Sequence, residues 1–323
     1  MKVDCHIHAL PERSIALLRR DPVYRVTLDG MKWHGGNYPD FTITSKWFDP
    51  ETALAGMKAN GIDMGIMSAA PKPLFYYEVD LEPAVAMCRE TNLGLAEYQA
   101  ARPQNFRWMA HLPLRYPKAA VDMLDKAAAA GCCGVIAGTS MAGRRLDEAE
   151  YEIFWSAVEQ LDMPVLLHPA YEHVSPGMGD FYLGSVIGMP TDATIALERL
   201  ICSGMLDRHP KARIISALGG GFFPYQVGRL RQCISYRPEL KHVRKDPWDY
   251  VGQIKFDTNV HESASLKFLI EFAGVDNVML GTDWPFSTAI DDPFGMLDTA
   301  AGGAAAIKTI SETGPAAYFK LKA

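Results

Sequence analysis

KVDCHIH (residues 2–8) is a short, largely apolar run of the length expected for a buried strand. Seven further runs of this kind follow it, and each precedes a longer segment with the apolar spacing of a helix. Such alternation is typical of β-α units arranged around a parallel sheet. The predicted strands cover residues 2–8, 63–69, 106–112, 133–139, 164–169, 212–218, 254–260 and 277–283.

The predicted helices complete this pattern. They cover residues 50–60, 81–101, 118–130, 147–161, 192–204, 223–233, 263–274 and 304–313. Eight strands with eight helices indicate a closed (β/α)8 TIM barrel, and an open doubly wound sheet is the weaker alternative. Barrels often exceed ~250 residues as one unit, so we interpret residues 1–323 as a single barrel domain.

One long segment interrupts the pattern between the first strand and its helix. Residues 20–47 contain YRVTLDG and MKWHGGNYPDF, which are rich in aromatic and turn-forming residues. A long connection after a barrel strand lies at the C-terminal face, where barrels build their active sites. We therefore interpret residues 20–47 as a cap-like insertion over the substrate.

The composition narrows the classes of function. Hydrophobic residues make up 48% of the chain and charged residues 22%, which is typical of a globular protein with a sizeable core. A net charge of −6 argues against nucleic acid as a partner. No apolar stretch approaches the ~20 residues that cross a membrane. Scattered cysteines without CxxC spacing, and an N-terminus without signal-peptide features, predict a cytoplasmic location.

Two histidines stand one residue apart in the first predicted strand. Side chains alternate along a strand, so Asp4, His6 and His8 share one face. Two imidazoles at the end of a rigid strand suit a divalent metal. A pair of hydrogen-bonded core histidines is the structural alternative.

Two further strands end in polar residues. His168 closes the apolar run PVLLHP, and Asp283 closes NVMLGTD. Taken singly, His168 could be a core histidine and Asp283 a helix cap. A carboxylate after a buried run is costly unless it is paired or bound to a cation. Together with His6 and His8, these residues form a candidate metal site at the C-terminal face of the barrel.

Several stretches of the chain resemble one family. They are DCHIHALP (4–11), LLHP (166–169), ALERLICSGMLDRHPKARII (196–215), LGGGFFPYQVGRL (218–230) and GTDWPF (281–286). In order and strand placement they are similar to the amidohydrolase superfamily, in the branch of 2-amino-3-carboxymuconate-6-semialdehyde decarboxylase and related aromatic-acid decarboxylases. The resemblance implies one divalent metal, usually zinc and sometimes manganese. The implied ligands are His6, His8, His168 and Asp283.

The resemblance also implies how many metals and subunits to expect. Binuclear relatives bridge two metals with a carboxylated lysine that ends the fourth strand. CGVIAGT (133–139) contains no lysine, so a single metal and no organic cofactor are expected. Relatives are often dimers, which implies a homodimer here.

Leu218 departs from this branch. Relatives carry AHGGG at the end of the sixth strand, and their histidine activates metal-bound water, whereas this chain has ALGGG. A hydrocarbon can neither take a proton from water nor orient it. A natural divergence and an engineered inactivation both account for the leucine.

This departure bears on the reaction. Decarboxylation of an ortho-hydroxy aromatic acid tolerates Leu218 better than hydrolysis does, because the substrate can chelate the metal through its own oxygens. We therefore predict a metal-dependent decarboxylase of a small hydroxylated aromatic or heteroaromatic acid, with Asp283 or an acid beside it as the proton carrier. The alternatives are a hydrolase or hydratase of the same fold, and a catalytically silent metal-binding barrel.

Weaker candidates complete the predicted site. His173, just after the fifth strand, could reach the substrate or orient His168. Aromatic residues in loops could form a flat pocket for a ring, and a cation could hold its carboxylate. The residues predicted to bind substrate are Lys46, Phe48, Trp284, Phe286 and Arg229, with Lys72 and Arg145 as further candidate cations. Arg229 lies in a predicted helix, so packing or a subunit contact is an equal alternative.

Overall fold

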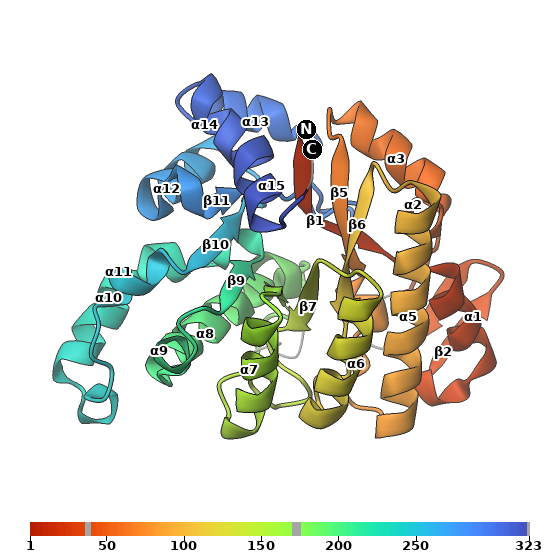
Figure 1. Cartoon of the computed structure of the whole chain (residues 1–323), viewed down its shortest axis with the longest axis horizontal. Helices are drawn as coiled ribbons and strands as arrows, with labels where there is room; N and C mark the ends of the chain where they lie inside the picture. The colour runs from red at the N-terminus through yellow and green to blue at the C-terminus, as the bar shows by residue number, and fades with distance from the viewer. Residues whose placement is uncertain (36–39, 170–175, 322–323) are drawn as a thin grey trace.

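Eight parallel strands form the centre of the computed structural model, which describes residues 1–35, 40–169 and 176–321 (Figure 1). Neighbouring strands are hydrogen bonded in the order β1-β5-β6-β7-β8-β9-β10-β11. They are β1 (Val3–Ala9), β5 (Met64–Ala69), β6 (Phe106–His111), β7 (Gly134–Gly138), β8 (Pro164–His168), β9 (Arg213–Ser216), β10 (Ile254–Asp257) and β11 (Val278–Met279). All eight predicted strands are confirmed, although β6, β7 and β8 end one residue earlier than predicted and the last three end two to four residues earlier.

The segment that follows β11 closes the barrel against β1. The backbone N–H of Asp283 donates to the carbonyl oxygen of His6 at 2.8 Å, and the N–H of His8 donates to the carbonyl oxygen of Trp284 at 2.8 Å. Because both edges of the sheet are joined in this way, the fold is the predicted closed (β/α)8 barrel and not an open sheet.

Helices follow the strands and cover the outside of the barrel, where α5, α6 and α7 lie side by side (Figure 1). The helices that match predicted ones are α3 (Pro50–Ala59), α5 (Leu81–Ala101), α6 (Pro117–Ala129), α7 (Glu152–Gln160), α8 (Met189–Cys202), α10 (Phe223–Tyr236) and α12 (Ser263–Ala273). The predicted helix at 304–313 is α14 (Ala304–Lys308) and the π-helical turn η7 (Thr309–Thr313). Within the described ranges, no helix combines the length and apolarity needed to cross a bilayer.

Shorter helices lie in the connections, and sequence analysis did not predict them. They are α1 (Glu12–Arg20), α2 (Ser45–Phe48), α4 (Pro71–Leu74), α9 (Met205–Arg208), α11 (Pro247–Val251), α13 (Pro293–Ala300) and α15 (Gly314–Tyr318). Capping residues set where some of the helices begin. The Asp49 carboxylate accepts the N–H of Thr52 at 2.8 Å, with Pro50 as the first residue of α3.

The insertion after β1 folds into its own small sheet. Strands β2 (Val26–Asp29), β3 (Lys32–Gly35) and β4 (Phe41–Thr42) pair antiparallel in that order. Trp47, at the end of the insertion, joins it to the barrel. Its ring lies 4.9 Å from the ring of Phe286, and its carbonyl oxygen accepts the N–H of Leu10 at 2.7 Å. The insertion is thereby fixed to the loop that follows β11.

Candidate metal centre

Three histidines and one aspartate meet at the C-terminal end of the barrel. The alternation of side chains along β1 puts His6 and His8 together, with their Nε2 atoms 2.9 Å apart. His168 is the last residue of β8, and Asp283 lies in the segment that closes the barrel. One ligand atom from each of the four residues lies within 4.8 Å of the others. The structure therefore brings together the four residues predicted as metal ligands.

The three imidazoles surround one carboxylate oxygen. Asp283 Oδ1 lies 3.1 Å from the Nε2 atom of His8, 3.5 Å from that of His6 and 3.9 Å from that of His168. The rings meet edge to face, at interplanar angles between 79° and 90°. Their nitrogen atoms therefore converge on one point, as ligands do around a single ion.

Asp257, the last residue of β10, holds His6 from the side away from this cluster. Its Oδ2 lies 2.5 Å from His6 Nδ1, and its Oδ1 accepts the backbone N–H groups of Gly219 at 2.7 Å and Asn259 at 3.2 Å. Burial alone would lower the pKa of His6, but the bond to Asp257 and the neighbouring carboxylates raise it above its usual value. A carboxylate in this position orients the imidazole so that Nε2 points to the ion.

The other two imidazoles are held in the same way. His8 Nδ1 lies 2.9 Å from Ser68 Oγ and 3.1 Å from the carbonyl oxygen of Ala69, and His168 Nδ1 donates to the carbonyl oxygen of Pro169 at 3.0 Å. Burial lowers the pKa of His8 to about 3 and also lowers the pKa of His168. Both are therefore neutral at pH 7, which is the form that binds a metal.

Two buried atoms of the cluster have no hydrogen-bond partner in the described part of the chain. They are His168 Nε2 and Asp283 Oδ1. Burial would raise the pKa of Asp283, but the nearby imidazoles of His168 and His8 outweigh it and hold the pKa below its usual range. An ionised carboxylate beside three imidazole nitrogens fits one divalent metal ion, since the ion would pair the two atoms that have no partner among the described residues.

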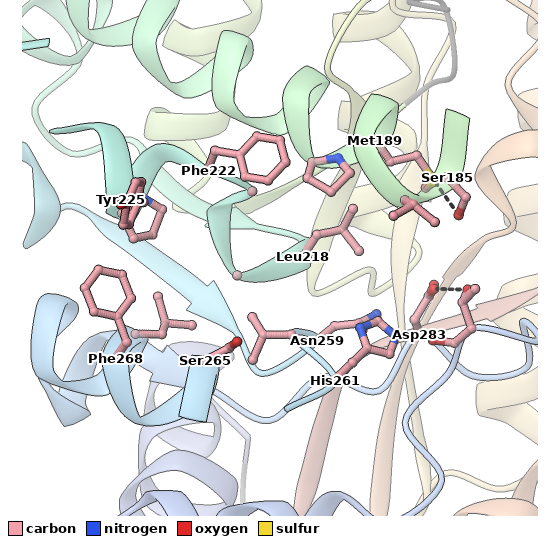
Figure 2. Close-up of a pocket in the computed structure, with 18 of the residues that line it drawn as sticks. Ser185, Met189, Leu218, Phe222, Tyr225, Asn259, His261, Ser265, Phe268 and Asp283 are labelled. Carbon is pink, nitrogen blue, oxygen red and sulfur yellow. Dashed lines mark hydrogen bonds between the residues drawn. The ribbon is translucent and has the colours of Figure 1, made fainter. Parts of the chain in front are cut away.

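Leu218 borders the cavity beside this cluster (Figure 2). It begins the turn η4 (Leu218–Gly220), in which Leu218 has φ 55° and Gly219 has φ 58°. A Cβ atom on Gly219 would lie 2.4 Å from Val260 Cγ1, so only glycine fits there. The turn thus directs a hydrocarbon into the site at the position where the family resemblance implies a histidine.

Two predicted substrate-binding candidates border the cluster. The ring of Phe286 lies 5.3 Å from the ring of His8. Lys72, in α4, lines a small cavity together with His168, Asp283 and Phe286. Burial lowers the pKa of Lys72 to about 7, and the charge of Asp283 opposes this shift. An amine and an aromatic ring therefore stand next to the candidate metal ligands.

The other predicted residues lie elsewhere or are not described. Trp284 packs its indole against α3. Lys46 is exposed and Phe48 half-buried in α2, and in the described ranges neither borders the cavities at the cluster. Arg229 lines a separate cavity between α8 and α10. His173 lies outside the described residues. Their part in binding or catalysis stays a prediction.

A cavity of about 770 Å³ opens from the cluster. Figure 2 shows Asp283 at one end of it and Tyr225 and Phe268 at the other. Residues that follow β8, β9 and β10 form its walls. Such a volume lies within the range of sites for drug-sized ligands, so the cavity can hold a small molecule beside the metal ligands.

Comparisons with known proteins agree with this geometry. The family model described as Amidohydrolase matches residues 3–309. The 2-amino-3-carboxymuconate-6-semialdehyde decarboxylase of Dictyostelium discoideum is 27% identical over 299 residues, which cover 88% of this chain and 82% of the relative. The gamma-resorcylate decarboxylase of Rhizobium sp. (strain MTP-10005) is 30% identical over 259 residues, which cover 73% of this chain and 76% of the relative.

A solved structure shares the fold. The crystal structure of a dihydroxybenzoic acid decarboxylase from Polaromonas sp. JS666, with bound manganese and the inhibitor 2-nitroresorcinol, superimposes with a TM-score of 0.80 at 24% identity. The match covers 100% of this chain and 98% of that chain. The family model itself spans nearly all of the sequence and includes every residue of the cluster. The chain is therefore a member of the amidohydrolase family, in the branch that contains decarboxylases of aromatic acids.

Proposed function

We propose that this chain is a metal-dependent decarboxylase of a small hydroxylated aromatic or heteroaromatic acid. One observation carries the proposal. A buried cluster of three histidines and one aspartate, with two ligand atoms that have no partner among the described residues, opens into a ligand-sized cavity. The relatives named above, which decarboxylate aromatic or related unsaturated acids according to their names, support the reaction class.

We propose that one divalent metal binds at the cluster. The proposed ligands are His6, His8, His168 and Asp283. Nitrogen and carboxylate donors suit zinc, our first choice, and manganese in the Polaromonas structure makes it the alternative. When bound, the ion would act as a Lewis acid on the carboxylate and ortho-hydroxyl oxygens of the substrate.

Asp283 is the proposed proton carrier. Its Oδ1 faces the imidazoles, and its Oδ2 accepts a hydrogen bond from Thr288 Oγ1 at 3.4 Å. In this scheme Asp283 takes the proton of the substrate hydroxyl and gives it to the ring carbon that bears the carboxylate. The bond to the carboxylate then breaks, its electron pair restores the aromatic ring, and carbon dioxide leaves. The phenolate product takes its proton from solvent.

Lys72 and Phe286 are the proposed substrate-binding residues. Both border the small cavity that contains His168 and Asp283. In the proposal, the Lys72 amine attracts the carboxylate and the Phe286 ring supports one face of the substrate ring. The insertion at 20–47 would act as a cap through Trp47, which packs on Phe286.

A homodimer in the cytoplasm is part of the proposal and rests on the sequence. The family resemblance motivates the dimer, and the cysteine pattern motivates the location. Light scattering on the purified protein should give about twice the mass of 35.6 kDa. A mass equal to one chain would contradict the dimer.

Metal content and carbon dioxide release test the proposed function. We would purify the chain without added metal, measure its metal by elemental analysis, and assay it on hydroxylated aromatic acids beside Leu218→His. About one metal per chain with activity in the parent supports a decarboxylase that works without this histidine. Activity only in the variant would support a disabled form, and metal without turnover in either would support the silent barrel. A hydrolase would instead release no carbon dioxide, and its hydrolytic activity would rise in Leu218→His.

A further inference from the structure

The cavity beside the candidate metal site is larger than a single-ring acid requires. Its volume of about 770 Å³ lies in the upper part of the range of ~300–1,000 Å³ that holds drug-sized ligands. An acid that reaches the metal ligands occupies only the end at Asp283 and Thr288. The rest of the cavity continues past Leu218 to Tyr225 and Phe268 (Figure 2).

The inner end of the cavity is polar and incompletely paired. Asn259 lines it and is only 2% exposed, yet neither side-chain amide atom has a hydrogen-bond partner in the described part of the chain. A buried amide without partners costs free energy unless a ligand or water completes it. The inner end can therefore recognise a polar group on a ring that lies beside Asp283.

The outer part of the cavity is lined mostly by hydrocarbon. Leu218 begins this lining next to the cluster, and aromatic rings end it (Figure 2). The apolar residues of this lining include Leu218, Phe222, Val260, Phe268 and Leu269. Phe222 and Phe268 are 41% and 44% exposed, so a ligand that covers them would remove apolar surface from water.

We propose that the substrate is an ortho-hydroxy aromatic acid that carries a hydrocarbon substituent, which lies along this groove towards Phe268. The inference deepens the proposed function and rests on it, since it assumes that the acid itself binds at the metal ligands. In this proposal Leu218 contacts the substituent, because its side chain continues the apolar wall up to the metal site. The substituent would be several carbons long, since the groove extends well beyond a methyl group.

A series of alkylated acids tests the groove by binding. The probes are 2-hydroxybenzoates with hydrogen, methyl, propyl or pentyl at ring position 4, 5 or 6, titrated calorimetrically into the metal-loaded protein. In one positional series the dissociation constant should fall by about two- to four-fold per methylene, as expected for burial in an apolar site. Equal dissociation constants along all three series would overturn the inference. The same fall per methylene at ring positions 4, 5 and 6 would also overturn it, because a groove accepts the chain from one position only.

A blocked groove provides the second test. Ser265 lines the cavity from α12, so Ser265→Trp would fill the outer groove without touching the metal ligands. The pentyl acid should bind at least about ten-fold more weakly to this variant, while the unsubstituted acid binds as before. Lys267→Trp is the matched control, because Lys267 is exposed on the same helix and is not among the residues that line the cavity. A chain-length gain that survives Ser265→Trp would overturn the inference.

Carbon dioxide release, measured on the same probes, separates this inference from the proposed function. If the dissociation constant falls with alkyl length but no acid releases carbon dioxide, the decarboxylase proposal is wrong and the groove assignment stands. If the unsubstituted acid is decarboxylated but the dissociation constant does not change with alkyl length, the groove assignment is wrong and the decarboxylase proposal stands.

Discussion

The two sides of the candidate site are built in opposite ways. On the metal side, each imidazole is held by a second partner, such as Asp257 behind His6 and Ser68 behind His8. On the cavity side, Leu218 offers hydrocarbon, and the buried amide of Asn259 has no partner among the described residues. The metal side is thus oriented before anything binds, whereas the cavity side is completed only by a ligand.

This difference indicates which property each side controls. Outer partners that fix imidazoles preorganise a site for its metal. An unpaired polar group beside an apolar wall instead finds its hydrogen-bond partner only when a substrate of matching shape binds, so such groups contribute to the affinity for that substrate. Substitutions on the metal side should therefore change metal content, and substitutions on the cavity side should change substrate affinity at constant metal content.

Loss of a ligand should have the largest effect. Asp283→Ala and His6→Ala each remove one of four donors from a buried cluster. We expect metal content to fall from about one per chain to near zero, and activity to be lost with it. Elemental analysis of the purified variants measures this directly. His242→Ala, at an exposed histidine, is the control. Full metal content in both cluster variants would show that the metal site is wrongly placed.

Asp257→Asn should weaken metal binding without abolishing it. The amide keeps the shape of the carboxylate but no longer provides a charged acceptor for the Nδ1 proton of His6. Loss of such an outer partner typically costs about 10- to 100-fold in metal affinity. Competition with a chelator measures the affinity, and Asp298→Asn, at an exposed carboxylate, is the control. An unchanged affinity would mean that the metal side does not depend on its outer partners.

His111 is buried but is not one of the proposed metal ligands, so it shows how burial alone affects a histidine. It ends β6, stacks on Phe75 at 5.2 Å, and its Nδ1 has no partner in the described part of the chain. Burial lowers its pKa to about 3, against 6.5 for an ordinary histidine. Between these values the unfolded state binds a proton that the folded state does not, so stability is complete above about pH 6.5 and is lost as the pH falls towards 3.

His111→Phe should reduce this pH dependence. One pKa unit corresponds to about 1.4 kcal/mol, so the variant should lose about 2–3 kcal/mol less unfolding free energy than the parent between pH 7 and pH 4.5. Urea unfolding at the two pH values measures the difference. His242→Phe, at an exposed histidine, is the matched control. An equal loss in His111→Phe and the parent would contradict the buried, neutral state of His111.

The metal ligands could be predicted because His6 and His8 share one face of a predicted strand, His168 and Asp283 each close an apolar run, and parallel strands of a barrel end at one face. Asp257 carries the same signal but was missed, because the predicted strand 254–260 extends three residues beyond the observed end of β10 and puts the aspartate mid-strand. The small sheet of the insertion was missed because β2, β3 and β4 have only two to four residues each, too few to show a strand pattern. The cavity depends on side chains from the segments that follow four strands, β8, β9, β10 and β11, so no local pattern predicts it.

Asn259→Leu should have the smallest effect and the most specific one. The substitution removes two buried amide atoms that have no partner among the described residues and replaces them with hydrocarbon of similar volume. We expect the unfolding free energy to stay the same or rise by about 1 kcal/mol, and metal content to stay at one per chain. Affinity for a hydroxylated acid should fall about five-fold, the value of one hydrogen bond.

Asn92→Leu is the matched control for this substitution. Asn92 is also buried, but its amide donates to the carbonyl oxygen of His111 at 2.9 Å and accepts the N–H of His111 at 2.7 Å. Its loss leaves two backbone groups unpaired, so the unfolding free energy should fall by about 2 kcal/mol or more. Urea unfolding and calorimetric titration of both variants test the contrast. If Asn259→Leu destabilises the fold as much as Asn92→Leu does, then Asn259 is paired within the protein, and the cavity side does not need a ligand to complete it.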